Sequence, residues 1–157
     1  MVSLHVIGVE EARRIVAGTP LPGDRWHPEY PLADELDVLR PLAATPGGGP
    51  APDPVFGLMM IRDAAGLAVG GIGFFGPPDA DGRVEIGYGL VPAARGRGLA
   101  SAALAEAIVI AAAHGVTMLR ADTDPANLPS SRVLERAGFV ELPPSDGLRH
   151  FALTLPT

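Results

Sequence analysis

Three strand-like segments follow one another between residues 55 and 91, and they limit the possible folds more than any other part of the chain. The segments are VFGLMMIRD (55–63), GLAVGGIGFFG (66–76) and RVEIGYGLV (83–91). The separators DAAG and PPDADG are rich in the Gly, Pro and Asp residues that turns favour. Because short turns join antiparallel neighbours, the pattern predicts a three-stranded antiparallel meander.

The string GIGFFG at residues 71–76 matches the G-x-G-x-x-G pattern of a dinucleotide-binding turn. That pattern binds a pyrophosphate only where its glycines open a helix. Here Pro77 and Pro78 follow, and then a turn. The better interpretation is a set of glycines inside a strand where another backbone comes close. A dinucleotide-dependent oxidoreductase is therefore the weakest of three functional hypotheses.

Helical and strand patterns alternate on both sides of the meander. Their order predicts a mixed α/β (α+β) fold in one domain, residues 1–157, with AATPGGGPAPDP (43–54) as a Pro/Gly-rich loop. PLADELDVLRPL (31–42) predicts a short helix at most. The longest helix shows one apolar face, formed by Ala100, Leu104, Ala107, Ile108 and Ala111. The expected helices cover 9–18, 32–42, 98–114 and 128–137, and the other expected strands cover 3–8, 116–123, 139–143 and 148–155.

The composition excludes several classes of function. The chain has net charge −6, whereas nucleic-acid binding needs clustered basic residues. It has no cysteine, which excludes disulfides, zinc-thiolate sites and an acyl-cysteine step. Its four histidines lack metal-ligand spacing, so no metal is expected. The longest apolar run, AIVIAAA (107–113), is too short to span a bilayer, so we expect no membrane partner and a cytoplasmic protein.

The junction VPAARGRGLA (91–100) has the features of an anion-binding loop. Consecutive main-chain N–H groups precede and open a helix, and glycines allow a ligand to come close. Two arginines add positive charge. The alternative is an ordinary strand-to-helix turn with solvated arginines. The candidate anion-binding residues are Arg95, Gly96, Arg97, Gly98, Leu99 and Ala100.

Two motifs resemble those of the GNAT (GCN5-related N-acetyltransferase) superfamily. Arg95-x-x-Gly98-x-Ala100 resembles its [Q/R]-x-x-G-x-[G/A] signature. The second motif is similar to that of the branch with the ribosomal-protein N-terminal acetyltransferases. The resemblance covers residues 55–142 well and the first fifty residues poorly. The second motif, N-x-x-S-x-x-x-L-x-x-x-G-F, is formed by Asn127, Ser130, Leu134, Gly138 and Phe139.

This resemblance implies a strongly bent, mostly antiparallel sheet flanked by about four helices. It also implies acetyl-CoA as cosubstrate, with its pyrophosphate on the loop that follows residue 94 and its pantetheine between two splayed central strands. A main-chain N–H near Leu90 or Val91 would stabilise the oxyanion that forms at the attacked carbonyl. Asn127 would cap its helix and contact the pantetheine.

Glu85 is the candidate general base. Strand alternation places Glu85, Gly87 and Gly89 on one face, a carboxylate beside bare backbone that a ligand can approach. An amine acceptor is mostly protonated at neutral pH because its pKa is about 10, so a base is needed. Glu85 would act directly or through water. The alternative is a strand carboxylate that pairs with an arginine.

The proton donor to the departing thiolate is less clearly marked. Many family members have a tyrosine in the second motif where this chain has Leu134. The nearest hydroxyl belongs to Ser130, which is either that donor or a partner of the main chain in the first helical turn. The stretch WHPEY gives candidates for acceptor binding, with packing beside prolines as the alternative. These candidates are Trp26, His27, Glu29 and Tyr30.

The leading hypothesis is therefore an N-acetyltransferase that moves an acetyl group from acetyl-CoA to a primary amine by direct attack in a ternary complex. The alternative is a non-catalytic acyl-CoA sensor or partner module of the same fold. Glu85 favours the enzyme, because a sensor needs no carboxylate there. The acceptor, a small molecule or a peptide N-terminus, and the oligomeric state are not defined by the sequence.

Overall fold

The computed structural model describes residues 1–46 and 54–156, and these form one mixed sheet with helices on both faces. The strand order is β1-β2-β3-β4-β5-β7-β6, and every neighbouring pair is antiparallel except β4–β5. This confirms the expected mostly antiparallel α/β class. The strands are β1 (Ser3–Val6), β2 (Leu58–Arg62), β3 (Ala68–Phe74), β4 (Arg83–Leu90), β5 (Met118–Thr123), β6 (Val140–Ser145) and β7 (Leu148–Thr154).

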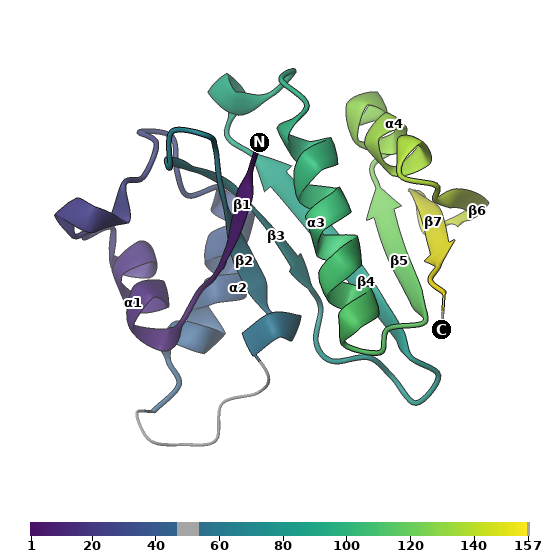
Figure 1. Ribbon diagram of the computed structural model, residues 1–157, viewed down its shortest axis with the longest axis horizontal. Coiled ribbons are helices and arrows are strands. Elements are labelled where there is room, and N and C mark those ends of the chain that lie inside the picture. Colours follow the sequence, from purple (N-terminus) through teal and green to yellow (C-terminus); the bar gives the residue numbers. More distant parts are fainter. Residues whose placement is uncertain (47–53, 157) are drawn as a thin grey trace.

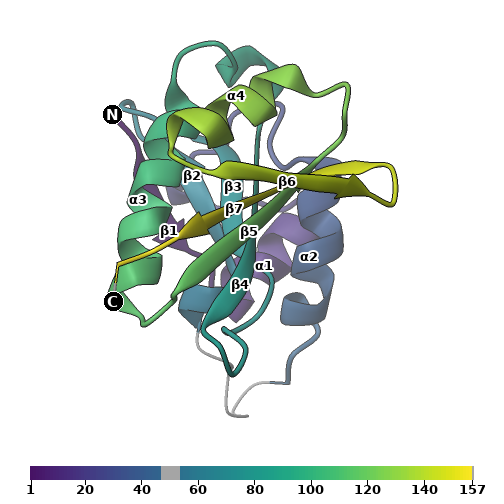
Figure 2. The same ribbon diagram turned by 90° about the vertical axis from the view of Figure 1, so that its right-hand side faces the viewer.

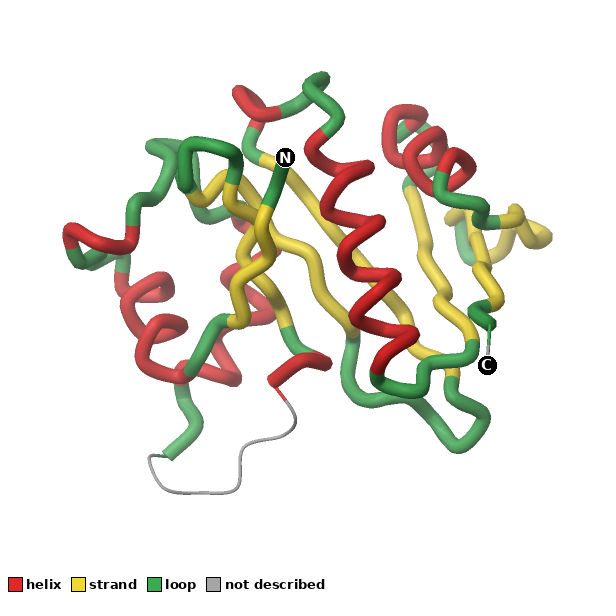
Figure 3. The backbone as a smooth tube through the Cα atoms, viewed as in Figure 1, coloured by secondary structure: helices red, strands yellow, loops and turns green. Residues whose placement is uncertain are grey.

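The helices lie on opposite faces of the sheet. Figure 1 shows α3 in front of the central strands, and Figure 2 shows α1 and α2 on the other side. In Figure 2 the last two strands, β6 and β7, run across the direction of β4, which confirms the expected bend. The coloured tube in Figure 3 shows the same arrangement by secondary structure. The helices are α1 (Val9–Ala17), α2 (Ala33–Ala43), α3 (Leu99–Ala113) and α4 (Leu128–Arg136).

The predicted meander is confirmed as β2, β3 and β4. The glycines of GIGFFG lie inside or just after β3, and no helix opens at them. A Cβ at Gly71 would clash with the Glu35 carboxylate, and one at Gly73 would approach the carbonyl oxygen of Gly57 to 2.6 Å, whereas Gly76 has open surroundings and a φ of 87°. Close contact with neighbouring segments therefore accounts for Gly71 and Gly73, backbone conformation accounts for Gly76, and the dinucleotide-binding turn is absent from this position.

The two central strands separate along their length. The parallel pairing of β4 with β5 covers three residue pairs and ends at Glu85 and Arg120. Main-chain groups of β4 alternate between its two neighbours. The N–H of Val91 donates to the carbonyl of Val69 at 2.8 Å, on the β3 side. The N–H of Leu90 is therefore directed to the β5 side, where strand pairing has already ended.

The long helix α3 begins one residue after Gly98, whose φ of 75° favours glycine. Its buried face includes Leu104, Ala107 and Ala111 as predicted, whereas Ala100 and Ile108 are only partly buried, and Ala103 replaces them in the core. Helix α2 matches the expected helix to within one residue at each end, with Pro41 inside it near its C-terminal end. Residues 47–53 of the predicted loop lie outside the described residues.

Within residues 1–46 and 54–156, no helix is long and apolar enough to cross a membrane. The same residues contain no group of three or more His, Asp or Glu side chains that could hold a metal ion.

Candidate active site

A groove of about 820 Å³ runs from the splayed end of β4 to the start of α3 and along α4. Seven of the nine residues that the sequence proposed for acetyl-CoA binding line it, so the two motifs face one space although they lie about 30 residues apart. The lining residues are Tyr88, Gly89, Leu90, Arg95, Gly96, Gly98, Leu99, Ala100, Ser101, Asp124, Ala126, Asn127, Pro129, Ser130, Arg132, Val133 and Arg136.

The main-chain N–H groups at the start of α3 are free to bind an anion. The helical hydrogen bonds begin with the N–H of Ala102, which donates to the carbonyl of Gly98 at 3.1 Å. The N–H groups of Leu99, Ala100 and Ser101 have no acceptor within the helix. By contrast, the N–H of Arg95 already donates to Pro92. The loop fits a pyrophosphate, and its donors begin later than the sequence indicated.

The arginines differ in their placement. Arg95 lines the groove, and its Nε donates to the carbonyl of Leu90 at 3.1 Å, which joins the loop to β4. Arg97 is exposed and does not line the groove. Arg132 and Arg136 on α4 do line it, and sequence reasoning missed both. Their i, i+4 spacing, which places them on one helix face, was the available signal.

Two other residues predicted to contact acetyl-CoA, Asn127 and Val91, differ in whether they reach the groove. Asn127 caps α4, because its Oδ1 accepts from the N–H of Ser130 at 3.3 Å, and it also lines the groove. Val91 is fully buried and its N–H is used by β3. Of the two candidates for stabilising an oxyanion, Leu90 is therefore the one whose N–H is available.

Tyr88 was given no role from the sequence. Its hydroxyl donates to the main-chain carbonyl of Ser130 and accepts from Ser130 Oγ, both at 3.1 Å. Burial raises the pKa of Tyr88, so the phenol stays protonated at neutral pH. Tyr88 lines the groove and also a second cavity on the other side of β4.

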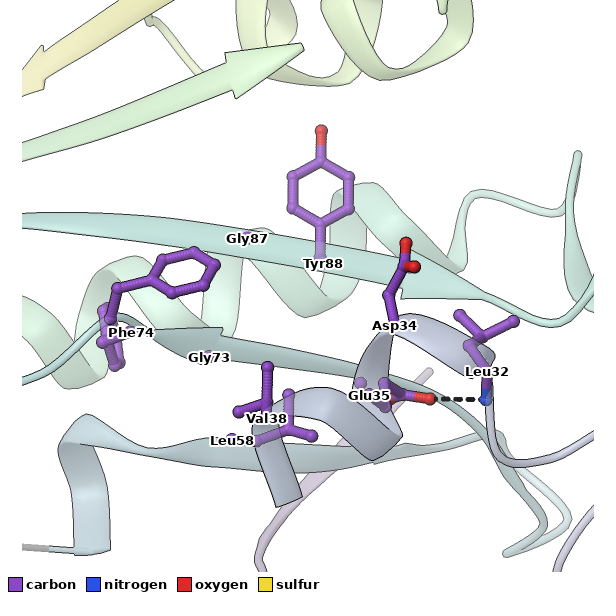
Figure 4. A pocket seen from close by; sticks show the side chains of 12 residues that line it. Leu32, Asp34, Glu35, Val38, Leu58, Gly73, Phe74, Gly87 and Tyr88 are labelled. Atoms are coloured by element: carbon purple, nitrogen blue, oxygen red, sulfur yellow. Dashed lines mark hydrogen bonds between the residues drawn. The ribbon is translucent and has the colours of Figure 1, made fainter. Parts of the chain in front are cut away.

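That second cavity, which we call the acceptor pocket, has a volume of about 240 Å³ and lies between α2 and strands β3 and β4 (Figure 4). Tyr88 and Gly89 belong to both cavities, so the two spaces meet at this point of β4. Its walls are mostly apolar. The residues that line it are Leu32, Asp34, Glu35, Val38, Leu58, Gly71, Gly73, Phe74, Phe75, Gly87, Tyr88 and Gly89.

Glu35 is a buried carboxylate in this pocket, with 6% of its surface exposed. Its Oε2 accepts from the N–H of Leu32 at 2.9 Å, which caps α2 (Figure 4). Its Oε1 is buried and has no hydrogen-bond partner within the described part of the chain. Burial, with a smaller contribution from the nearby Asp34, raises the pKa of Glu35 to about 7, and the hydrogen bond from the Leu32 N–H opposes this shift.

Glu85, the base proposed from the sequence, lines neither the groove nor the acceptor pocket. It is exposed on β4 opposite Arg120. Partial burial and the nearby Asp122 raise its pKa, and Arg120 and His150 oppose that shift. Its role as a base stays a prediction, in which it would act through water.

The WHPEY residues lie beside the pocket walls and line neither cavity. Trp26 packs on Tyr30 with ring centroids 5.8 Å apart, and Tyr30 is buried. The His27 ring accepts from the N–H of Glu29 at 3.0 Å, and Glu29 accepts from the N–H of Ala93 at 3.1 Å. The observed contacts are packing and loop bracing, and contact with an acceptor stays a prediction. Helix α2 supplies Asp34, Glu35 and Val38 to the pocket.

Comparisons with known proteins agree with this geometry. The family model described as "Acetyltransferase (GNAT) domain" matches residues 24–140. No curated protein matches the sequence. Among solved structures, RimJ from Mycobacterium smegmatis in complex with CoA-disulfide is 22% identical, with coverage of 98% of this chain and 81% of that chain and a TM-score of 0.65.

Two further structures cover a smaller share of the chain. Ribosomal-protein-alanine N-acetyltransferase from Brucella melitensis is 24% identical over 64% of this chain and 69% of that chain, with a TM-score of 0.55. The yncA protein from Salmonella typhimurium, solved with acetyl-CoA, is 23% identical over 64% and 65%, with a TM-score of 0.55. At these identities the structures show a shared fold. The names of the RimJ structure and of the ribosomal-protein-alanine N-acetyltransferase are consistent with the ribosomal-protein acetyltransferase branch that the second motif indicated. Because the family model spans most of the chain, the protein belongs to the GNAT acetyltransferase family.

Proposed function

We propose that this protein transfers the acetyl group of acetyl-CoA to a primary amine by direct attack in a ternary complex. The observation that carries the proposal is the meeting of two cavities at Tyr88 and Gly89. One cavity offers helix N-terminal amides and arginines, which suit a pyrophosphate. The other is small, mostly apolar and holds carboxylates, which suits an amine.

Different groups in the groove would bind different parts of the cosubstrate. The free N–H groups from Leu99 to Ser101, with Arg95, Arg132 and Arg136, would bind the phosphates. Acetyl-CoA supplies the activated carbonyl, and the N–H of Leu90 would stabilise the negative charge on its oxygen. Tyr88 would then stand at the boundary between the thioester and the acceptor.

The Tyr88 and Ser130 pair supplies a proton donor although the second motif lacks a tyrosine. When the Tyr88 proton is transferred to the departing sulfur, Ser130 Oγ can continue to donate to the phenolate oxygen and stabilise its charge. Ser130 is then a positioning residue, and Tyr88 is the residue that contacts the reacting atoms. Leu134, at the family's tyrosine position, is fully buried in the core.

Calorimetry with acetyl-CoA and a thiol-release assay with several amines test the proposal together. We expect acetyl-CoA binding and release of CoA that depends on an amine. Binding without turnover on any amine would replace the enzyme with the acyl-CoA sensor, and an absence of acetyl-CoA binding would overturn both. The amine panel should include spermidine, an alanine-terminated peptide, free amino acids and simple monoamines, because the sequence does not define the acceptor.

A further inference from the structure

We propose that the acceptor pocket selects a compact monoamine with an apolar body and no acidic group, and that Glu35 takes the proton from its ammonium group. This inference rests on the proposed acetyl transfer and defines its substrate class and base. It is carried by the unpartnered oxygen of Glu35, the character of the pocket walls and the size of the pocket.

Glu35 has one oxygen engaged and one that is buried without a hydrogen-bond partner in the described part of the chain. Oε2 is held by the Leu32 N–H, which fixes the orientation of the carboxylate, while Oε1 has no partner among the described residues. A Cβ at Gly71 would come within 1.8 Å of Oε1, so the glycine of β3 creates the space that the carboxylate occupies. A buried acceptor without a donor is costly, and an ammonium group is a strong donor that would satisfy it.

The walls of the pocket exclude an acceptor that carries its own negative charge. The lining residues include no arginine or histidine, and the chain contains no lysine. A carboxylate next to the amine, as in an amino acid, would enter the pocket without a cationic partner and would face Asp34 and Glu35. Apolar side chains form most of the walls, and Phe75 and Val38 at the pocket are 58% and 43% exposed.

The size of the pocket limits the acceptor further. Its volume of about 240 Å³ is less than a third of the 820 Å³ of the groove, so it suits a compact body. A peptide N-terminus would place unpaired amide groups against apolar walls. A polyamine would extend its second ammonium beyond the space around Glu35. A monoamine with a short alkyl chain or a single ring fits both the volume and the lining.

The proton balance follows from these positions. The ionised Glu35 accepts one proton from the ammonium, and the neutral nitrogen attacks the thioester carbon. A C–N bond forms, the C–S bond breaks, and the sulfur receives the Tyr88 proton. The second proton that the nitrogen loses returns to Tyr88, by way of solvent, and Glu35 releases its own proton to solvent. The products are an amide, a free thiol and one proton.

A matched pair of substrates tests the selection directly. Phenethylamine and phenylalanine share one body and differ by a carboxylate, so we expect kcat/KM to be at least about a hundredfold higher for phenethylamine. Spermidine and an alanine-terminated peptide should also be at least about tenfold poorer than phenethylamine. Preference for phenylalanine, spermidine or the peptide would overturn the substrate class.

A matched pair of variants tests Glu35. Glu35→Gln should lower kcat/KM by roughly two to four orders of magnitude and remove the acidic limb of its pH profile, while acetyl-CoA affinity is unchanged. Asp37→Asn, on an exposed residue of the same helix, should retain wild-type turnover. High pH, which supplies free amine, should partly restore Glu35→Gln. A structural role would lower the melting temperature and leave the acidic limb in place, and that result would overturn the assignment.

Glu85→Gln decides between the two carboxylates. If this variant lost the acidic limb while Glu35→Gln kept it, the base would be Glu85. Turnover measurements on the wild-type enzyme distinguish a failure of this inference from a failure of the proposed function. Turnover with some amine but without the predicted preference contradicts the pocket alone, whereas acetyl-CoA binding without turnover on any amine contradicts the acetyl transfer itself.

Discussion

The hydroxyl group of Tyr88 and the backbone and side chain of Ser130 form two hydrogen bonds in opposite directions, each 3.1 Å long. In one bond the Tyr88 hydroxyl donates its proton to the Ser130 carbonyl. In the other bond the Tyr88 oxygen accepts a proton from the Ser130 hydroxyl. Because the two residues come from β4 and α4, the pair also bridges the gap left where β4 and β5 separate.

Tyr88→Phe tests this pair as the source of the proton for the leaving thiolate. The variant keeps the ring and removes the hydroxyl, so kcat should fall by roughly a hundredfold while the Kd for acetyl-CoA changes little. Steady-state kinetics and calorimetry measure the two effects. Ser130→Ala should have a smaller effect on kcat, because it removes a positioning hydroxyl. Wild-type kcat in Tyr88→Phe would show that solvent protonates the sulfur.

Arg136→Ala should weaken acetyl-CoA binding by about tenfold at low ionic strength, and the loss should shrink as salt is added. Both arginines are exposed, but Arg136 lines the groove and Arg97 does not. Arg97→Ala is therefore the matched comparison, with a smaller change expected. Calorimetric titrations at two salt concentrations measure both. Equal losses in the two variants would show that Arg97 also reaches the phosphates.

Gly98→Ala should lower the free energy of unfolding by about 1–2 kcal/mol, because its φ of 75° disfavours any residue with a Cβ. Urea denaturation measures this change. Gly23, in the 3-10 turn Pro22–Asp24, has no positive φ and equally open surroundings, so Gly23→Ala is the control and should not lower the free energy of unfolding. Equal costs at the two positions would contradict the assignment to backbone conformation.

The pH dependence of stability should include a contribution from Asp24. Arg14 donates to both of its oxygens, at 2.9 and 2.8 Å, and lowers the pKa of this buried carboxyl, with help from the Leu21 N–H. A lowered folded-state pKa means that the stabilisation is complete above the ordinary value near 4 and is lost as the pH falls below it. Asp24→Asn should therefore flatten the acid side of a plot of unfolding free energy against pH, and Asp37→Asn should not.

The order of elements and the anion-binding loop were predictable because their causes are local. Turn residues separate the strands of the meander, and glycines mark the start of α3. The acceptor pocket depends on tertiary packing instead. Glu35 falls in a charged helical pattern that is typical of a solvated face, and its burial results from the bare backbone of Gly71 on a distant strand.

Tyr88 was missed for a related reason. Alternation along β4 places it with the core residues Ile86 and Leu90, and that is correct for a strand with two paired neighbours. The pairing with β5 ends before Tyr88, so its side chain can reach Ser130 instead of packing under a helix. No local sequence pattern indicates where the pairing of two parallel strands ends.

The short pairing between β4 and β5 should also divide the sheet into two units for hydrogen exchange. Strand pairing across this line covers only three residue pairs in the described residues. Sub-global opening along it would expose amides of β5 and β7 to solvent while the meander stays protected. A ligand that fills the groove touches Tyr88 on one side and Ser130 on the other, and so closes this opening. The amides of β5 and β7 that exchange through this opening would then exchange more slowly by one common factor, set by the ligand concentration relative to its Kd.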